Sequence, residues 1–500
     1  MSQAVVSVNA AVLLPVLAPA IGAAVVLVVD VAAPHLRRTH YMVALASLAI
    51  GALATIAGLG MVAGQVRQTL CLPGSGQCMY AADGVASALQ LGALLAAAVT
   101  LLLSWPDDKK QSSGSTAVIV SLVLAATAGA TAVAGARDLG SWLVALELAT
   151  LPTIALVALR GARSAISGAV ALLTTALVSF GLLALAAALW FTATGSGFLT
   201  PAAALTVIGD PSRRPILVLA VALVVAGIGF KLSLVPFHAW TPEAYDGAPL
   251  PIAAFLAGVS KIAALAALLV VIRAIAPLGA PVLISIAIVA AASMTLGNIM
   301  ALRQDGVVRL LAWSTVAQAG WVVLPLATLS SAAVYASGAY LLAYVLATLL
   351  AFAVVAALVQ TRGSVRARDL ASYRGLVDDH PVLAAALGLA LLSLAGLPPG
   401  VLGLVAKVTA LRPVVGSELW LLAVVAAVNA VLGVAVYLRW LRAALASPDV
   451  LSQAGPDGVP AVRAQVLRVH PATLVAVGFA AVALVVTSVN PQLILGLLGS

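Results

Sequence analysis

Residues 215–240 read PILVLAVALVVAGIGFKLSLVPFHAW and contain one Lys or acidic side chain, Lys231. A helix needs about 20 mostly apolar residues to cross the hydrocarbon of a bilayer, so this stretch predicts a membrane span. Pro236 interrupts the pattern near the end of the span, because proline lacks an amide hydrogen and crowds the preceding helical turn. The stretch therefore predicts a helix that is irregular inside the membrane.

The apolar character of this stretch extends through the whole chain. Of its 500 residues, 63% are hydrophobic and 8% are charged, whereas soluble domains carry about 25% charged residues. This composition excludes an ordinary soluble protein and predicts one all-α polytopic membrane domain. The net charge of +9 does not indicate nucleic-acid binding, because the basic residues are scattered between apolar runs. The first apolar run has no basic region before it, so we expect no signal peptide.

The apolar runs predict about fourteen transmembrane helices. They cover residues 10–33, 41–63, 85–104, 116–136, 139–159, 165–193, 215–240, 251–272, 280–301, 308–328, 333–359, 381–411, 418–438 and 471–497. The twelfth run is overlong and contains Pro398-Pro399-Gly400, so we expect a second helix that is broken inside the membrane. No loop is long enough for a soluble enzyme domain.

Basic residues predict the orientation of these spans. Most of the 25 Lys and Arg residues lie in connections that follow odd-numbered spans, and such connections face the cytoplasm by the positive-inside rule. These basic residues are Arg37, Arg38, Lys109, Lys110, Arg160, Arg163, Arg303, Arg309, Arg362, Arg366, Arg368, Arg374, Arg439, Arg442, Arg463 and Arg468. Both termini are then expected on the outer side of the membrane.

The only two cysteines, Cys71 and Cys78, lie in one polar connection on this expected outer side. Two thiols alone make a poor metal site. In an oxidising compartment they could form a disulfide, and the alternative is a pair of free thiols. The sequence leaves both states open.

Four charged residues fall well inside predicted spans: Glu147, Lys231, Lys261 and Lys407. Each costs about 2.5–3.5 kcal/mol at the centre of a membrane helix, and such residues mark ion or proton pathways by default. The alternatives are snorkelling of a lysine to the interface and, for Glu147, simple neutralisation of a lysine. Snorkelling suits neither Lys261, which lies about ten residues into its span, nor Lys407, which is flanked by apolar turns.

Buried amines suit proton transfer for a physical reason. Desolvation disfavours the charged form of a buried amine, whereas a nearby carboxylate favours it. Movement of Glu147 toward or away from Lys231 would therefore switch proton occupancy. Transfer of one charge across the membrane involves about 2.3 kcal/mol per 100 mV, and pair electrostatics in a low dielectric can supply energies on this scale.

The two proline-interrupted spans fall at matching places in two halves of the chain, which is typical of inverted-repeat transporters. We therefore expect residues 1–115 to form three N-terminal helices and 116–273 a first five-helix repeat. Residues 274–445 would form a second, inverted repeat, and 446–500 a cytoplasmic loop with helix 14.

Other polar residues carry weaker signals. His238 is either a proton entry point on the cytoplasmic side or a capping residue, and Glu243 and Asp246 are expected to be solvated. Tyr335, Tyr340 and Tyr344 have helical spacing and suit packing better than a cofactor site. The sequence has no phosphate-binding loop, dinucleotide fingerprint, cysteine cluster or zinc motif. We therefore expect no cofactor or metal in this chain.

One long motif resembles a known family. Residues 229–249 read GFKLSLVPFHAWTPEAYDGAP, which resembles the central signature of the antiporter-like subunits of respiratory complex I. The segment TPEAYDGAP is similar to the corresponding segment of the N branch of this family. The L and M branches and the Mrp cation/proton antiporters usually have the sequence LPDA at this position. Residues 138–148 (DLGSWLVALEL), 259–261 (VSK) and 396–400 (GLPPG) extend the resemblance over most of spans 4–13.

The resemblance implies a fourteen-helix proton-pumping subunit with two inverted five-helix repeats, broken in helices 7 and 12. By position it implies that Glu147, Lys231, Lys261 and Lys407 carry the proton pathway. Residues 309–320 (RLLAWSTVAQAG) depart from the family, which usually has a histidine where this chain has Gln318. A glutamine cannot titrate, so a relay between Lys261 and Lys407 would use water, Ser314 or other hydroxyls.

The resemblance also implies partners. A family member of the N type works beside subunits M, K and J in a bacterial plasma membrane, and other subunits of the complex hold FMN, iron–sulfur clusters and quinone. The Ala-, Val- and Gly-rich composition suggests a high-GC bacterium, and an actinobacterial member would use menaquinone. Two other functions remain open: a stand-alone cation/proton antiporter of the Mrp type, and a purely structural spacer within the complex.

Overall fold

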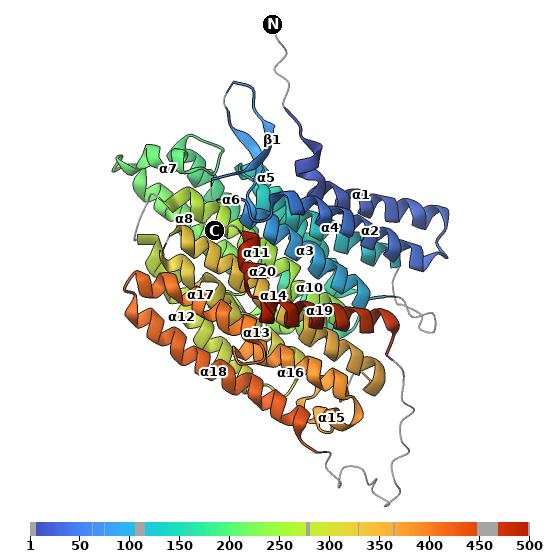
Figure 1. Cartoon of the computed structure of the whole chain (residues 1–500). Coiled ribbons are helices and arrows are strands. Elements are labelled where there is room, and N and C mark those ends of the chain that lie inside the picture. The colour runs from blue at the N-terminus through green and yellow to red at the C-terminus, as the bar shows by residue number, and fades with distance from the viewer. Residues whose placement is uncertain are drawn as a thin grey trace, which may run out of the picture.

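The structure is a computed structural model that describes residues 7–62, 64–74, 76–105, 116–159, 161–276, 281–328, 330–363, 366–447 and 469–498. Long helices lie side by side through most of the molecule (Figure 1). Within the described residues, 13 helices are long and apolar enough to cross a membrane. The prediction of an all-α polytopic membrane protein is confirmed.

The N-terminal third consists of four long helices and a two-stranded hairpin. These elements are α1 (Ala10–Ala32), α2 (Arg37–Thr55), β1 (Arg67–Cys71), β2 (Cys78–Ala82), α3 (Gly84–Leu103) and α4 (Thr116–Gly135). The strands pair antiparallel, with Thr69 opposite Tyr80 and Cys71 opposite Cys78. Cys71 and Cys78 form a disulfide, which settles the question that the sequence left open.

The middle of the chain contains the first broken span. Its helices are α5 (Leu139–Ala158), α6 (Arg163–Thr194), α7 (Pro201–Ile208), α8 (Arg214–Leu232), α9 (Trp240–Gly247), α10 (Leu250–Ala257) and α11 (Val259–Ile275). Helix α8 ends where Ser233 adopts a left-handed conformation, with φ 68° and ψ 35°. The irregular segment that follows contains Pro236, as the sequence predicts.

The last part of the chain contains the second broken span. Its helices are α12 (Pro281–Leu302), α13 (Val307–Val323), α14 (Ser331–Arg362), α15 (Leu376–Asp379), α16 (Pro381–Ala395), α17 (Val401–Gly416), α18 (Trp420–Leu445), α19 (Pro471–Val489) and α20 (Gln492–Leu495). The predicted run 381–411 is divided into α16 and α17. Gly396 ends α16 with φ 79°, and the two prolines follow it.

Several predicted boundaries differ from the structure, three of them as follows. The second span was expected over 41–63, but α2 begins at Arg37, and a short 3₁₀ turn after Thr55 leads to Gly60 with φ 65°. The last span was expected to reach residue 497, but α19 ends at Val489, because Pro491 disfavours helical backbone in the residue before it. Helix α18 extends to Leu445, seven residues beyond the prediction, because its last turns carry Arg439 and Arg442 at its polar end.

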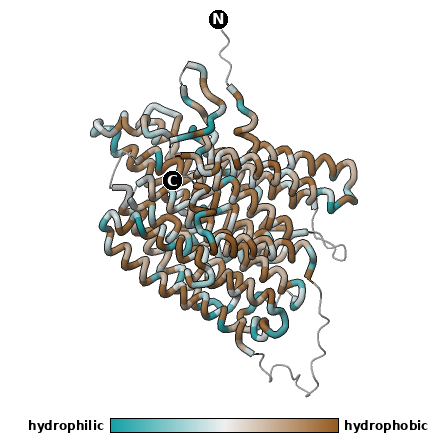
Figure 2. Tube along the Cα trace, viewed as in Figure 1, coloured by the Kyte–Doolittle hydropathy of each residue, from teal (hydrophilic) through white to brown (hydrophobic). Residues whose placement is uncertain are grey.

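The burial of the helices separates an interior from a periphery. The segment 250–275 and helices α13 and α14 are almost fully enclosed, whereas α1, α6, α18 and α19 leave about two thirds of their most apolar stretch uncovered. In Figure 2, hydrophobic residues continue along these peripheral helices, and hydrophilic residues gather in the hairpin and around α15. This pattern suits a bundle surrounded by lipid or by other membrane subunits.

Part of the predicted orientation rests on basic residues that lie outside the described residues. These are Lys109, Lys110, Arg160, Arg463 and Arg468. The end of the bundle that carries the β1–β2 hairpin is called the hairpin end below, without reference to a side of the membrane.

Candidate proton-transfer site

An ion pair joins α5 to α8 inside the bundle. Lys231 Nζ lies 2.9 Å from Glu147 Oε1 and donates a second hydrogen bond to Thr150 Oγ1 at 2.9 Å. The lysine side chain is 7% exposed and the glutamate side chain 14%. Because an unpaired buried charge is strongly unfavourable, the two helices are held together by the charges that would otherwise oppose insertion.

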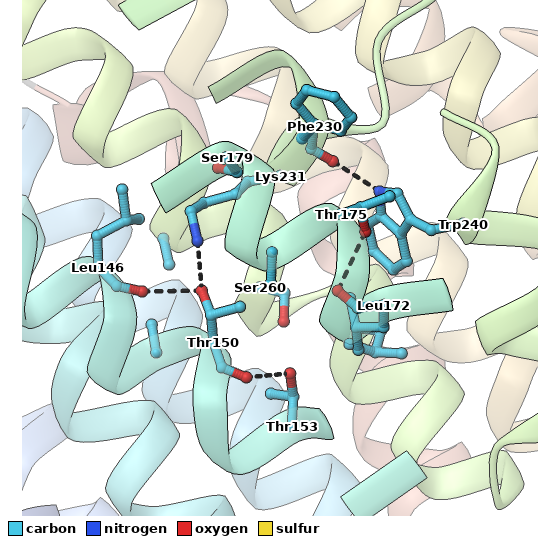
Figure 3. A pocket seen from close by; sticks show the side chains of 14 residues that line it. Leu146, Thr150, Thr153, Leu172, Thr175, Ser179, Phe230, Lys231, Trp240 and Ser260 are labelled. Carbon is cyan, nitrogen blue, oxygen red and sulfur yellow. Dashed lines mark hydrogen bonds between the residues drawn. The ribbon is translucent and has the colours of Figure 1, made fainter. Parts of the chain in front are cut away.

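A cavity lies beside this pair. Its volume is about 30 Å³, and its lining includes Lys231, Thr150, Ser179 and Ser260. Figure 3 shows the Lys231 amine pointing toward Thr150, whose hydroxyl in turn donates to the Leu146 carbonyl. The ammonium group therefore faces a space with several hydroxyl groups, which suits water and proton exchange.

Lys261 reaches the same break from α11. Its side chain is buried, with 1% of the residue exposed. Lys261 Nζ donates to the main-chain oxygen of Lys231 at 2.9 Å and to Ser233 Oγ at 2.5 Å. The last carbonyls of a helix have no partner within the helix, so the end of α8 supplies the acceptor for a second lysine.

Residues of α9 close the other side of Lys261. Its Nζ lies 4.8 Å from the centre of the Trp240 ring, and Thr241 Oγ1 donates to Ser233 Oγ at 2.5 Å. The Trp240 indole donates to the Phe230 carbonyl at 2.7 Å, which ties α9 back to α8. The ammonium thus has two hydrogen-bond acceptors at the break, the Lys231 carbonyl and the Ser233 hydroxyl, and one aromatic face.

A hydrogen-bonded group of α13, α14 and α18 occupies the centre of the second half. Gln318 Nε2 donates to the Tyr437 hydroxyl at 2.8 Å, and the Tyr340 hydroxyl donates to Gln318 Oε1. Ser314 Oγ lies 2.6 Å from the same Tyr437 oxygen. Tyr344 donates to Thr315 Oγ1 at 2.8 Å. Each of these buried hydroxyl and amide groups can both accept and donate hydrogen bonds.

Lys407 lies beside this group. A small cavity between them is lined by Gln318, Tyr340, Tyr344 and Lys407. Lys407 Nζ donates to the Ala395 carbonyl at 2.6 Å and lies 5.7 Å from the centre of the Trp321 ring. Ala395 is the last residue of α16, so this lysine, like Lys261, bonds to the carbonyl end of an interrupted helix.

The two lysines share an electrostatic environment. The carboxyl end of a helix carries a partial negative charge, equivalent to about half an electron. Among the described residues, neither Lys261 nor Lys407 has a carboxylate within ion-pair distance. Each amine is therefore stabilised by a helix end, a tryptophan face and hydrogen bonds, rather than by a fixed counter-ion.

Tyr245 lies between the two halves of this arrangement. Its ring centre is 6.5 Å from that of Trp240 and 6.3 Å from that of Phe352 in α14. It therefore connects the packing around Lys261 to the helix that carries Tyr340 and Tyr344.

The weaker predictions have mixed outcomes. His238 is partly buried, with its ring centre 5.2 Å from that of Trp313. The capping alternative for His238 is wrong, because the N-cap of α9 is Ala239. The side chains of Glu243 and Asp246 are 51% and 40% exposed, as expected for solvated residues, and both also lie near arginines. Arg309 lies 3.7 Å from Glu243 and 3.8 Å from Asp246, and Arg368 lies 3.4 Å from Asp246.

The sequence reasoning missed several polar members of the site. Tyr437, Thr150, Ser233 and Thr241 were not predicted from the sequence, although Tyr437 is a phenol in an apolar span. Tyr340 and Tyr344 were interpreted as packing, yet their hydroxyls are hydrogen bonded within the central group. A search for hydroxyl groups within one or two turns of each buried charge would have found Thr150 and Ser233.

The described residues contain no group of three or more His, Cys, Asp or Glu side chains that could hold a metal ion.

Comparisons with known proteins agree with this architecture. A family model described as NADH:quinone oxidoreductase/Mrp antiporter, transmembrane, matches residues 136–433. NADH-quinone oxidoreductase subunit N of Salinispora tropica is 39% identical over 457 residues, which cover 87% of this chain and 85% of that protein. Subunit N 2 of Streptomyces griseus is 38% identical over 446 residues, or 86% of this chain and 81% of its own length.

Solved structures show the same fold. A chain of the respiratory complex I of Thermus thermophilus with bound aureothin matches 97% of this chain and 99% of its own, with a TM-score of 0.77 and 31% identity. A chain of the Mrp complex of Dietzia sp. DQ12-45-1b matches 98% of this chain and 96% of its own, with a TM-score of 0.80 and 21% identity. The second likeness concerns the fold alone. The chain belongs to the NADH:quinone oxidoreductase/Mrp antiporter transmembrane family, in the branch whose curated members are named NADH-quinone oxidoreductase subunit N.

Proposed function

We propose that the chain is a proton-translocating membrane subunit of the N type in an NADH-quinone oxidoreductase. Protons would move along Glu147, Lys231, Lys261 and Lys407, with Ser314 and Gln318 in the central section and His238 near the entry. The observation that carries the proposal is the contact of both first-half lysines with one helix break. Lys231 bonds to Glu147, and Lys261 bonds to the Lys231 carbonyl.

The chemistry of the site favours transfer of protons over permanent protonation of the lysines. The ammonium groups of Lys261 and Lys407 bond to hydroxyl and carbonyl oxygens, so each can lose a proton without leaving an unpaired carboxylate behind. A movement at the break would change the Lys231–Glu147 distance and the Lys261 hydrogen bonds together, because both involve residues 231–233. One displacement would therefore alter the proton affinity of two adjacent amines.

The remaining parts of the proposal concern the assembly. FMN, iron–sulfur clusters and quinone, with menaquinone as the expected quinone, would be held by other subunits, and subunits M, K and J would be neighbours. The membrane would be the bacterial plasma membrane, with both termini and the disulfide hairpin outside. Residues 1–115, 116–273, 274–445 and 446–500 would be the functional divisions of the chain.

Proton pumping is tested in vesicles that contain the whole complex. Lys231→Ala should lower the proton-to-electron ratio and the coupled turnover, while assembly persists. Since this change leaves Glu147 buried without its partner, the double variant Lys231→Met/Glu147→Gln separates lost pumping from the cost of an unpaired charge. Arg213→Gln, which breaks an exposed pair with Asp210, is the matched control. A full proton-to-electron ratio in Lys231→Ala contradicts the proposed role of this lysine.

Vesicle experiments also distinguish two other functions. In vesicles that hold this chain without the quinone-reducing partners, a stand-alone antiporter would carry sodium. A structural spacer would keep full pumping after simultaneous neutralisation of Glu147, Lys231, Lys261 and Lys407. The free-energy cost of placing four charged side chains in the membrane argues against a structural spacer. The similarity to the Mrp complex of Dietzia indicates a shared fold only.

The proposed orientation is tested with the cysteines. In intact cells treated with a membrane-impermeant reductant, Cys71 and Cys78 should become accessible to a membrane-impermeant maleimide. Without the reductant they should stay unlabelled, because the disulfide leaves no free thiol. Labelling only in inverted vesicles would place the hairpin in the cytoplasm.

A further inference from the structure

A large cavity lies at the hairpin end, away from the lysines. Its volume is about 360 Å³, and its lining combines apolar residues such as Phe198 and Val270 with polar ones that include Arg137 and Arg273. No step of the proposed proton pathway uses it. The cavity lies between the hairpin, the junction of α4 and α5, the start of α7 and the end of α11.

Main-chain hydrogen bonds hold the walls of this cavity in place. Arg137 N donates to the Met79 carbonyl in β2 at 2.9 Å, and Leu199 N donates to the Arg137 carbonyl at 2.8 Å. Tyr80 pairs with Ala136, and its hydroxyl accepts a hydrogen bond from Gln90 Nε2 at 2.5 Å. The hairpin, the α4–α5 junction and the segment before α7 are thus joined as one rigid wall, so the cavity is preformed.

The charges of the cavity do not balance. Arg273 Nη1 lies 2.5 Å from Asp83 Oδ2, and the other oxygen of Asp83 accepts from Ala86 N as the N-cap of α3. Arg137 Nη1 donates only to main-chain oxygens, Ala136 at 2.9 Å and Ala134 at 3.4 Å. Among the described residues, Arg137 therefore has no carboxylate within ion-pair distance.

Helix ends do not remove this excess of positive charge. Helices α4 and α11 end at the cavity and each contributes about half a negative charge, whereas α3, α5 and α7 begin there and each contributes about half a positive charge. The charged residues that line the cavity are two arginines and one aspartate, with a net charge of about +1. The neighbouring Asp138 carboxylate does not line it and bonds to Ser141 as the N-cap of α5. Burial and the neighbouring Arg273 lower the pKa of Arg137 to about 10, so this guanidinium is still charged at neutral pH.

We propose that this cavity binds a phosphate group, whose three or more acceptor oxygens would bridge Arg137 and Arg273 and reach the Thr200 hydroxyl. The paired N–H groups of a guanidinium can donate two parallel hydrogen bonds to phosphate oxygens. A buried positive charge without a carboxylate partner is stabilised by a bound anion. The cavity lies where the spans end, which is the level of lipid headgroups. The apolar walls suit the carbon atoms attached to a phospholipid phosphate, and the same chemistry would accept free phosphate.

Thermal unfolding of the purified full-length chain in a nonionic detergent tests this site. Phosphatidylglycerol, phosphatidylcholine and inorganic phosphate are titrated separately. Phosphatidylglycerol should raise the unfolding temperature of the wild type, and Arg137→Gln should raise the half-saturating concentration about tenfold. Arg214→Gln removes an exposed arginine at the start of α8 and should behave like the wild type.

The separate arms identify the source of the phosphate. Protection by phosphatidylglycerol alone indicates a lipid headgroup, whereas equal protection by inorganic phosphate with the same Arg137 dependence indicates a free anion. If Arg137→Gln does not fold, Gln68→Glu places a negative charge at the exposed rim of the cavity and should weaken binding similarly. Absence of protection in all three arms, or equal weakening by Arg137→Gln and Arg214→Gln, overturns the proposal. This experiment measures binding and the earlier one measures proton pumping, so failure of this proposal can be distinguished from failure of the proposed function.

Discussion

Lys261 donates a hydrogen bond to the main-chain carbonyl of Lys231, so two lysines from different helices meet at one peptide group. The carbonyl is free because α8 ends at Ser233. The position of one amine thus depends on the backbone that carries the other, and the helix break is the element they share.

The Ser233 hydroxyl is the first target. It contacts both Lys261 and Thr241, and a hydrogen bond to a charged group is worth about 1.5–3 kcal/mol. Ser233→Ala and Ser233→Gly should both lower coupled turnover, by about tenfold or more. The glycine variant should unfold at the higher temperature of the two, because the backbone here has φ 68°, which glycine adopts without strain. Full turnover of Ser233→Gly would mean that the hydroxyl has no role.

Two tyrosines of α14 form a matched pair of variants. The Tyr340 hydroxyl bonds to Gln318, whereas that of Tyr335, on the same helix, bonds to the Leu495 carbonyl at 2.6 Å. Tyr340→Phe should lower the proton-to-electron ratio, and Tyr335→Phe should leave it unchanged, as measured in vesicles of the whole complex. Equal effects of the two variants would assign the loss to packing instead of proton transfer.

Gln318→His tests the central group through pH. A neutral imidazole can donate to Tyr437 and accept from Tyr340, as the glutamine does, but an imidazolium has only donors. Turnover of the variant should match the wild type at pH 8 and fall as the pH drops through the ordinary histidine pKa of about 6.5. Comparison of the two pH profiles checks this, and the wild type should lack the step because glutamine does not titrate. Identical profiles between pH 5.5 and 8 would contradict it.

Helix α17 offers a steric test of the second break. A Cβ at Gly403 would lie 1.7 Å from the Ser393 carbonyl oxygen, whereas a Cβ at Gly416 would have no heavy atom of another residue within 4 Å. Gly403→Ala should therefore destabilise the packing of α16 on α17 by about 3 kcal/mol or more, and Gly416→Ala should be neutral or slightly stabilising. Thermal unfolding of the purified chain measures both. A stable Gly403→Ala variant would mean that the two half-helices do not pack this closely.

The sequence predicted those features that depend on local composition. The spans follow from runs of about 20 apolar residues, and both breaks follow from prolines within such runs, Pro236 and Pro398-Pro399. The four buried charges stand out because each is costly in lipid. Boundaries such as that at Thr55 were missed, since the apolar residues continue past the point where the backbone turns.

The contacts between distant residues could not be predicted in this way. Gln318 and Tyr437 are 119 residues apart, and no spacing rule connects a residue of α13 to one of α18. The bond from Lys261 to the Lys231 carbonyl depends on a backbone group that every residue has, so no side-chain pattern reveals it. The disulfide needed the strand register, which places Cys71 opposite Cys78.

Asp246, in α9, is shared by two arginines, Arg309 of α13 and Arg368 further along the chain. Each oxygen of this carboxylate faces one guanidinium group, so a displacement of α9 would alter both contacts at once. Because α9 follows the break at Ser233, such a displacement would also move the segment that surrounds Lys261. We therefore expect a movement at the break to be transmitted through Asp246 to α13 and to the segment around Arg368.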